Sequence, residues 1–273
     1  MYARIRRLAT VAFVVAGALI PARAARAADI PNIAAASSLQ FALTDIAAEF
    51  KRASGHDVRL AFGSSGNFRR QIADGAPFEL FLSADAGYAD ALVREQRTSG
   101  PGIVYAVGRL ALFVPTGSPI EADAGLRDVA AALRDGRLRK FAIANPALAP
   151  YGRAAQQVLE HAGLWVRIES HLVLGENISQ AAQFAASGAA QAGIVAYSLV
   201  REPGIAAQGA AVLLPATDHA PLEQQMVILK AAGATAREFA AFVLTSKAQA
   251  IFARYGLEPP ARAPASASPR APA

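Results

Sequence analysis

The chain has 273 residues, enough for two domains, and its 53% apolar and 18% charged residues exclude a wholly disordered protein. The formal net charge of +6 is concentrated at the N-terminus, because residues 1–27 carry five arginines and no acidic residue. Without those five, 22 basic residues face 21 acidic ones, a net charge of +1. This near-balance predicts that the protein has no nucleic acid partner.

Residues 1–27 have the organisation of a secretory signal peptide. A basic start precedes an uncharged apolar stretch at residues 8–20, and two A-x-A-like cleavage sequences follow at residues 22–24 and 25–27. The apolar stretch is shorter than the roughly 20 residues that a membrane span needs. We therefore expect cleavage and export to the periplasm, with an uncleaved anchor as the alternative.

The chain contains no cysteine. This excludes disulfides, cysteine–zinc and iron–sulfur sites, a thiol nucleophile and a lipid-modified cysteine anchor. The four histidines, His56, His161, His171 and His219, show no spacing typical of metal ligands. We expect no cofactor, no directly bound metal ion and no enzymatic activity.

Between residues 30 and 94 the sequence pattern alternates between strand and helix three times. Short apolar runs at residues 30–35, 58–62 and 78–82 predict strands, and a segment with helical spacing of apolar residues follows each run. The first helix is expected to open at Ser38, and Asp85 is the predicted N-cap of the third. This order predicts an α/β fold with a parallel sheet covered by helices.

The alternation continues through the rest of the chain. Further strands are predicted at residues 110–114, 141–144, 193–196 and 225–229, and helices at 126–133, 151–161, 178–188 and 236–255. We predict two Rossmann-like α/β lobes joined by crossover strands. Lobe I comprises residues 28–108 and 222–258, and lobe II comprises residues 109–221. Residues 259–273, rich in Pro, Ala and Ser, predict a disordered tail.

Four predicted strand-to-helix turns are rich in small or hydroxyl residues: Ser37-Ser38, Ser64-Ser65-Gly66, Ala149-Pro150-Tyr151-Gly152 and Gly175-Glu176-Asn177-Ile178. The first N–H groups of a helix lack intrahelical partners and carry the positive end of its dipole. Small residues let an anion approach these groups. Because such turns line the ligand crevice of an open α/β sheet, the residues predict a small-anion site.

Each of these residues also has a purely structural interpretation. The serines and Asn177 are residue types that favour the N-cap position of a helix. Tyr151 could be a half-buried aromatic residue beside Pro150, and Ile178 a core residue of which only the backbone N–H is available. The residue pattern alone leaves these alternatives open and does not name the anion.

Five short motifs follow one another in a specific order: Ala-Ala-Ser-Ser-Leu at 35–39, Phe-Gly-Ser-Ser-Gly at 62–66, Leu-Ser-Ala-Asp at 82–85, Ala-Pro-Tyr-Gly at 149–152 and Gly-Ile-Val-Ala at 193–196. Together they resemble the periplasmic molybdate-binding proteins of ABC importers, which have the type II periplasmic-binding-protein fold. The resemblance extends over residues 30–259. It implies that molybdenum is bound only as the oxyanion.

The resemblance implies oxyanion contacts from both lobes: Ser38 through its hydroxyl and N–H, Ser65, Tyr151, the N–H of Ile178, and Ser37 as an additional donor. Some family members have a tyrosine directly after Gly-Ile-Val, where this chain has Ala196. Tyr197 comes one residue later and would face the other side of a strand. The tyrosine contact of those members is therefore not carried over to Tyr197, and the sequence leaves open whether Tyr197 approaches the ligand.

The function implied by the resemblance is a monomeric periplasmic receptor. It captures molybdate or tungstate between its lobes and delivers the oxyanion to the membrane permease subunits of an ABC importer. One alternative is a receptor of the same fold for another oxyanion, such as sulfate or thiosulfate. Another is a secreted serine hydrolase that uses the turn at residues 63–66. That turn departs from G-x-S-x-G, because Asn67 occupies the last glycine position.

Overall fold

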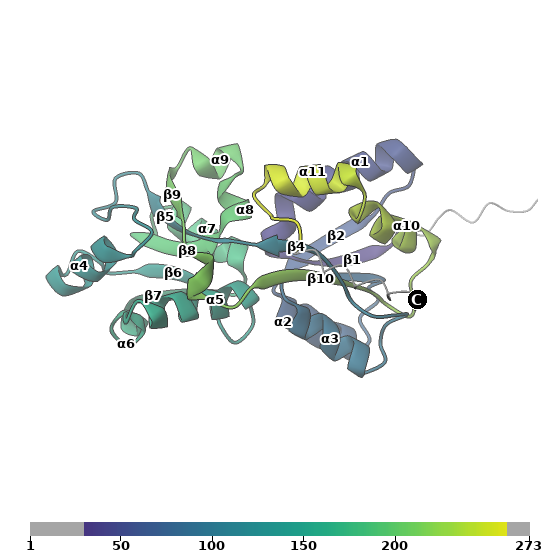
Figure 1. The fold of residues 1–273 in the computed structure, drawn as a ribbon, viewed down its shortest axis with the longest axis horizontal. Coiled ribbons are helices and arrows are strands. Elements are labelled where there is room, and N and C mark those ends of the chain that lie inside the picture. The colour runs from purple at the N-terminus through teal and green to yellow at the C-terminus, as the bar shows by residue number, and fades with distance from the viewer. Residues whose placement is uncertain (1–29, 261–273) are drawn as a thin grey trace, which may run out of the picture.

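The computed structural model describes residues 30–260, which form two lobes side by side, each built on a five-stranded sheet (Figure 1). The predicted signal peptide lies outside the described residues, as does the predicted tail from residue 261 onward. Within residues 30–260, none of the helices combines the length and the apolar character needed to cross a bilayer.

The sheet of lobe I has the strand order β2-β1-β3-β10-β4. Its strands are β1 (Asn32–Ala36), β2 (Arg59–Gly63), β3 (Leu80–Ser83), β4 (Ile103–Gly108) and β10 (Leu222–Ile228). Strands β1, β2 and β3 are parallel, and β10 is antiparallel to β3 and β4. The helices of this lobe are α1 (Gln40–Ser54), α2 (Ser65–Ala73), α3 (Ala86–Arg94), α10 (Ala234–Val243) and α11 (Ser246–Arg254).

Helices cover both faces of this sheet, as a largely parallel sheet requires. Helices α1, α10 and α11 lie on one face, and α2 and α3 lie on the other (Figure 1). Ile33 of β1 belongs to the core of the first face, where Phe50 and Phe239 pack edge to face with ring centres 5.2 Å apart. The neighbouring Ala34 belongs to the core of the second face, with Phe68. With both faces covered, the ends of the strands remain available for a site.

Lobe II repeats this plan with the strand order β7-β6-β8-β5-β9. Its strands are β5 (Leu110–Pro115), β6 (Phe141–Ala144), β7 (Leu172–Gly175), β8 (Ala192–Ala196) and β9 (Gly209–Leu213). Its helices are α4 (Arg127–Asp135), α5 (Pro150–His161), α6 (Trp165–Ile168), α7 (Ile178–Ala186), α8 (Tyr197–Val200) and α9 (Pro203–Ala206). Strand β6 is parallel to β7 and β8, while β5 is antiparallel to β8 and β9.

The chain crosses between the sheets twice. It leaves lobe I at the end of β4 and enters lobe II at β5, with only Arg109 between the two strands. After β9 and the short 3₁₀ helix η3 (Ala216–Asp218), it returns along β10, which pairs with β4. Glu258 also joins this region, because its backbone pairs with Val107 and its carboxylate contacts Arg109 at 2.5 Å. Two neighbouring antiparallel strands thus carry the chain between the lobes.

The α/β two-lobe prediction is confirmed, and the differences concern particular elements. The helix expected to open at Ser38 begins as a 3₁₀ turn, η1 (Ser37–Leu39), before α1. Strands β4, β7 and β9 were not predicted; they are edge strands with partly exposed residues. The helical pattern expected at residues 236–255 forms two helices, α10 and α11, because Thr245 caps a new helix start.

Candidate functional site

The five residues predicted for the site, Ser37, Ser38, Ser65, Tyr151 and Ile178, line one cavity where the lobes meet. The other lining residues are Ala36, Gly63, Ser64, Ala84, Ala149 and Pro150. The cavity has a volume of about 10 Å³, room for about one water molecule. Every lining side chain is uncharged, so the cavity presents hydroxyl and backbone groups.

The first turn of lobe I places Ser37 and Ser38 directly after β1. Neither serine is the N-cap, because that position is Ala36 and no side-chain cap bond forms there. The Ser37 carbonyl accepts the Ser179 hydroxyl at 3.0 Å, and the Ser37 hydroxyl accepts the Ser179 N–H at 3.3 Å. Ser38 Oγ is buried and has no hydrogen-bond partner among residues 30–260. Since buried hydroxyls are normally bonded, this group is suited to a ligand.

The second turn contains two serines, each of which accepts a backbone N–H through its oxygen and keeps its own hydrogen. Ser64 is the N-cap of α2, and its Oγ accepts the N–H of Asn67 at 3.4 Å. Ser65 begins the helix, and its Oγ accepts the N–H of Ala84 at 3.0 Å. Because that N–H occupies a lone pair of the Ser65 oxygen, the hydroxyl retains its hydrogen for donation to another group.

Tyr151 lies in the first turn of α5, after Pro150 at the first helical position. Proline has no N–H, so the Tyr151 N–H is the first donor of this helix and lacks an intrahelical acceptor. The Tyr151 hydroxyl is buried, without a partner in the described chain, and a Cβ added at Gly108 would lie 2.1 Å from it. Burial raises the pKa of Tyr151, and the nearby Ser38 hydroxyl lowers it by less, so the phenol stays neutral.

In the fourth turn, Asn177 and Ile178 have different roles. Asn177 is the N-cap of α7, and its Oδ1 accepts the N–H groups of Ser179 at 3.0 Å and Gln180 at 3.1 Å. The N–H of Ile178, which precedes both, has no intrahelical acceptor. The Ile178 side chain belongs to the hydrophobic core. Asn177 is therefore a cap, and Ile178 offers the cavity its backbone N–H.

Four helix starts, two from each lobe, thus surround the cavity. Their unpaired N–H groups and the positive ends of their dipoles favour an anion. In addition to the two bonds between Ser37 and Ser179, further hydrogen bonds join the lobes around it: Ser198 Oγ to the Ser38 carbonyl at 2.6 Å, the Gly66 N–H to the Leu148 carbonyl at 3.0 Å, and Asn67 Nδ2 to Glu176 Oε1 at 2.7 Å. The structure therefore has its lobes closed on each other.

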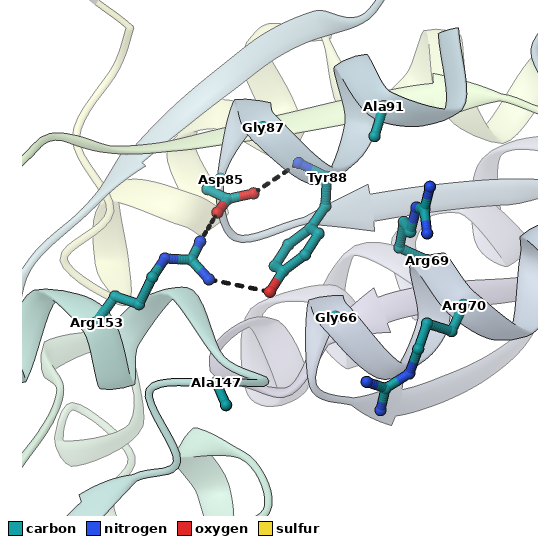
Figure 2. A pocket seen from close by; sticks show the side chains of 9 residues that line it. All are labelled: Gly66, Arg69, Arg70, Asp85, Gly87, Tyr88, Ala91, Ala147 and Arg153. Atoms are coloured by element: carbon teal, nitrogen blue, oxygen red, sulfur yellow. Dashed lines mark hydrogen bonds and ion pairs between the residues drawn. The ribbon is translucent and has the colours of Figure 1, made fainter. Parts of the chain in front are cut away.

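A further contact between the lobes is centred on Arg153 of α5 (Figure 2). Its guanidinium forms an ion pair with Asp85, donates to the Tyr88 hydroxyl at 2.9 Å and lies 5.0 Å from the centre of the Tyr88 ring. Asp85 is also the N-cap of α3, accepting the Tyr88 N–H at 3.0 Å through its other oxygen. We call Arg153, Asp85 and Tyr88 the clasp. It borders a surface pocket of about 600 Å³ and joins the first turns of α5 and α3.

The residues around Tyr197 correct the expected geometry. Strand β8 ends at Ala196, so Tyr197 begins α8 rather than continuing a strand. Its ring lies against Gly256 and the guanidinium of Arg201, and it does not line the cavity. Ser198 reaches across to lobe I instead. Sequence reasoning missed Ser198 and the clasp; the only available signal was their position at the carboxyl ends of strands or in first helical turns.

Within residues 30–260, no group of three or more His, Asp or Glu side chains is arranged to hold a metal ion. The cavity itself is lined by uncharged residues.

The comparisons with known proteins agree on one group of relatives. The family model described as bacterial extracellular solute-binding protein matches residues 31–258. The molybdate-binding protein ModA of Azotobacter vinelandii is 40% identical over 214 residues, which are 78% of this chain and 82% of the relative. The protein of the same name from Rhodobacter capsulatus is 38% identical over 256 residues, 92% of this chain and 96% of the relative.

Solved structures agree with these matches. The periplasmic molybdate-binding protein of Azotobacter vinelandii superposes with a TM-score of 0.76 at 31% identity, covering 85% of this chain and 100% of that one. The sulfate-binding protein SubI of Mycobacterium tuberculosis shares the fold, with a TM-score of 0.70 at 16% identity over 85% of this chain and 87% of that one. The fold alone therefore does not select the oxyanion. Similarity over nearly the whole of residues 30–260 shows that this chain belongs to the family of bacterial extracellular solute-binding proteins and is a homologue of the molybdate-binding proteins named ModA.

Proposed function

We propose that this protein is the periplasmic receptor of an ABC importer, that it works as a monomer, and that it captures molybdate or tungstate between its lobes for delivery to the membrane permease subunits. The observation that carries the proposal is the ring of uncharged donors from both lobes around one cavity. These are the hydroxyls of Ser38 and Ser65, the N–H groups of Tyr151 and Ile178, and Ser37 beside them. The names of the relatives support the choice of oxyanion, and the expected signal peptide supports the location.

Donors without a matching acceptor favour a fully deprotonated dianion. Monohydrogen phosphate carries a proton that needs an acceptor, and none of the lining side chains has a carboxylate. Leaving a buried polar group unpaired costs about 1–3 kcal/mol, which is roughly 5- to 150-fold in affinity. Sulfate has the same charge and shape as molybdate, so the size of the closed cavity must distinguish the two.

Uptake of the ligand requires the lobes to separate. The cavity volume of about 10 Å³ is smaller than an oxyanion with four oxygen atoms, so the donors move outward as they receive it. The crossover strands β4 and β10 are the connection about which such a hinge motion occurs in binding proteins of this class. The bonds from Ser179 and Ser198 to lobe I, and the clasp, break when the lobes open.

Titration calorimetry of residues 28–273 with molybdate, tungstate, sulfate and phosphate tests the proposal. We expect one molybdate or tungstate per chain, with sulfate at least about tenfold weaker and phosphate weaker still. Sulfate binding more tightly than molybdate would identify a receptor for another oxyanion. Absence of binding by all four anions would overturn the proposal.

The serine hydrolase alternative finds no support in the contacts of Ser65. A nucleophilic serine needs a base within hydrogen-bond distance. Among residues 30–260, Ser65 Oγ is bonded to the Ala84 N–H. The histidines have other partners: His56 contacts Glu238, His161 contacts Asp218, His171 contacts Ser170 and His219 contacts Ala220. Ester turnover abolished by Ser65→Ala would be needed to revive this alternative.

A further inference from the structure

We infer that Gln224, a buried residue of the crossover strand β10, is a positioning residue of the oxyanion site. Its side chain holds the backbone of Ala84, and Ala84 in turn holds the Ser65 hydroxyl as a donor. The inference rests on the proposed function. Gln224 does not line the cavity itself, so it would act through the two residues that do.

The role of Gln224 follows from where the β3–β10 ladder ends. The last pair of this ladder is Ser83 with Gln225. Ala84 lies one residue beyond, is 2% exposed, and needs a donor for its carbonyl. Gln224 supplies that donor from its side chain: Nε2 donates to the Ala84 carbonyl at 3.2 Å and to the Leu222 carbonyl at 3.0 Å. An amide side chain thus replaces the missing backbone pair.

Ala84 transmits this support to the cavity. Its N–H donates to Ser65 Oγ at 3.0 Å, and its carbonyl accepts from Gln224, so the residue is held from both sides. The N–H occupies one position around the Ser65 oxygen and so restricts the hydroxyl hydrogen to the two that remain. Without the amide of Gln224, Ala84 has an unpaired buried carbonyl and its backbone is free to rotate. The direction of the Ser65 hydroxyl is then less restricted.

Gln224 also lies beside the site residue of the opposite lobe. A Cβ added at Gly108 would lie 3.0 Å from Gln224 Nε2 and 2.1 Å from the Tyr151 hydroxyl. Gln224 Oε1 and the Tyr151 hydroxyl are both buried without a partner among the described residues. The Gln224 side chain therefore bonds to Ala84 of lobe I and lies near Tyr151 of lobe II.

The same strand provides a matched control. A β-bulge at Gln224 and Gln225 interrupts the pairing of β10 with β4, and both glutamines are buried. Gln225 Nε2 donates to Asp90 of α3 at 2.7 Å, and within residues 30–260 its side chain forms no hydrogen bond with Ala84 or Ser65. Substitution of either glutamine therefore removes hydrogen bonds of a buried side-chain amide. Of the two, and among the described residues, only the Gln224 side chain bonds to a residue that lines the cavity, which is Ala84.

The experiment compares molybdate binding by the wild type, Gln224→Met and Gln225→Met, using calorimetry and thermal unfolding. We expect both variants to unfold at lower temperature, Gln224→Met to bind roughly tenfold more weakly, and Gln225→Met to bind within about twofold of the wild type. If the wild type binds molybdate and the two variants have equal affinity, the inference is overturned and the proposed function is unaffected. A wild type that fails to bind would overturn the proposed function instead.

If Gln224→Met does not fold, the pH dependence of molybdate binding by Gln224→Glu tests the inference instead. A protonated carboxyl donates to the Ala84 carbonyl, whereas an ionised one cannot and repels the bound dianion. Burial raises the pKa of a carboxyl, so binding by this variant should strengthen as the pH falls from about 9 to about 6. The buried phenols of Tyr105 and Tyr151 stay neutral over this range because burial raises their pKa, and Asp85 is paired with Arg153. A profile that matches the wild type throughout would overturn the inference.

Discussion

Adjacent serines in the turn after β2 differ in what their oxygen atoms accept. Ser64 accepts an N–H from its own helix, whereas Ser65 accepts one from Ala84, 19 residues along the chain. In the first turn, Ser38 has a buried oxygen without a partner in the described chain. All three hydroxyls therefore keep a hydrogen for donation, and Ser64 differs in that it also caps its own helix.

Ser38→Ala and Ser65→Ala should each weaken molybdate binding by about 1–3 kcal/mol, because each removes a hydrogen bond to a charged partner. Ser64→Ala should instead lower the free energy of unfolding by about 0.5–2 kcal/mol, the usual loss for a missing N-cap, with a smaller effect on affinity. Calorimetry and thermal unfolding separate the two effects. Wild-type affinity in the Ser38→Ala, Ser65→Ala double variant would remove both serines from the site.

At the scale of elements, the clasp connects the starts of α5 and α3, which belong to different lobes. The α5 start also carries Tyr151, which lines the cavity, so the clasp lies in the same helical turn as a site residue. The Arg153 side chain is 43% exposed and that of Asp85 is 17% exposed. This partial exposure limits the strength of the ion pair. Its free energy still adds to ligand binding, because the pair exists only while the lobes are closed.

Arg153→Gln and Asp85→Asn should each speed molybdate dissociation, because both remove the ion pair of the closed form. A partly exposed pair is worth about 0.2–1 kcal/mol, which is roughly 1.5- to 5-fold. Asp85→Asn is the cleaner variant, since asparagine retains the N-cap acceptor for α3. Dissociation rates are measured by displacement with excess tungstate. Fully additive effects in the double variant would show that the two residues do not act as a pair.

At the scale of the whole molecule, two lobes with separate sheets are joined by β4, β10 and the segment around Glu258. Each lobe contributes two of the four helix starts around the cavity. A ligand that contacts all four binds the closed form more tightly than the open one. The difference between those two affinities is what shifts the protein toward closure.

Small-angle X-ray scattering should therefore show a smaller radius of gyration with saturating molybdate than without ligand. The same addition should raise the free energy of unfolding, by about 2.7 kcal/mol at 100 times the dissociation constant. Phosphate at equal concentration is the control and should change neither quantity. An unchanged radius of gyration in the presence of a clear thermal shift would contradict lobe closure as the mode of capture.

The sequence by itself determined the alternation of strands and helices and the four turns that carry Ser38, Ser65, Tyr151 and Ile178. These features are local, because apolar periodicity and capping chemistry act within a few residues. That the site residues touch the oxyanion stays a prediction.

Only the tertiary structure decided which hydroxyls are free, which residues hold them and how the lobes meet. The decisive contacts join residues far apart in the chain: Arg153 and Asp85 are separated by 68 positions, Gln224 and Ala84 by 140, and Ser198 and Ser38 by 160. The edge strands β4, β7 and β9 also depend on partners elsewhere in their sheets. No local pattern encodes such contacts, because they arise only when separate elements pack together.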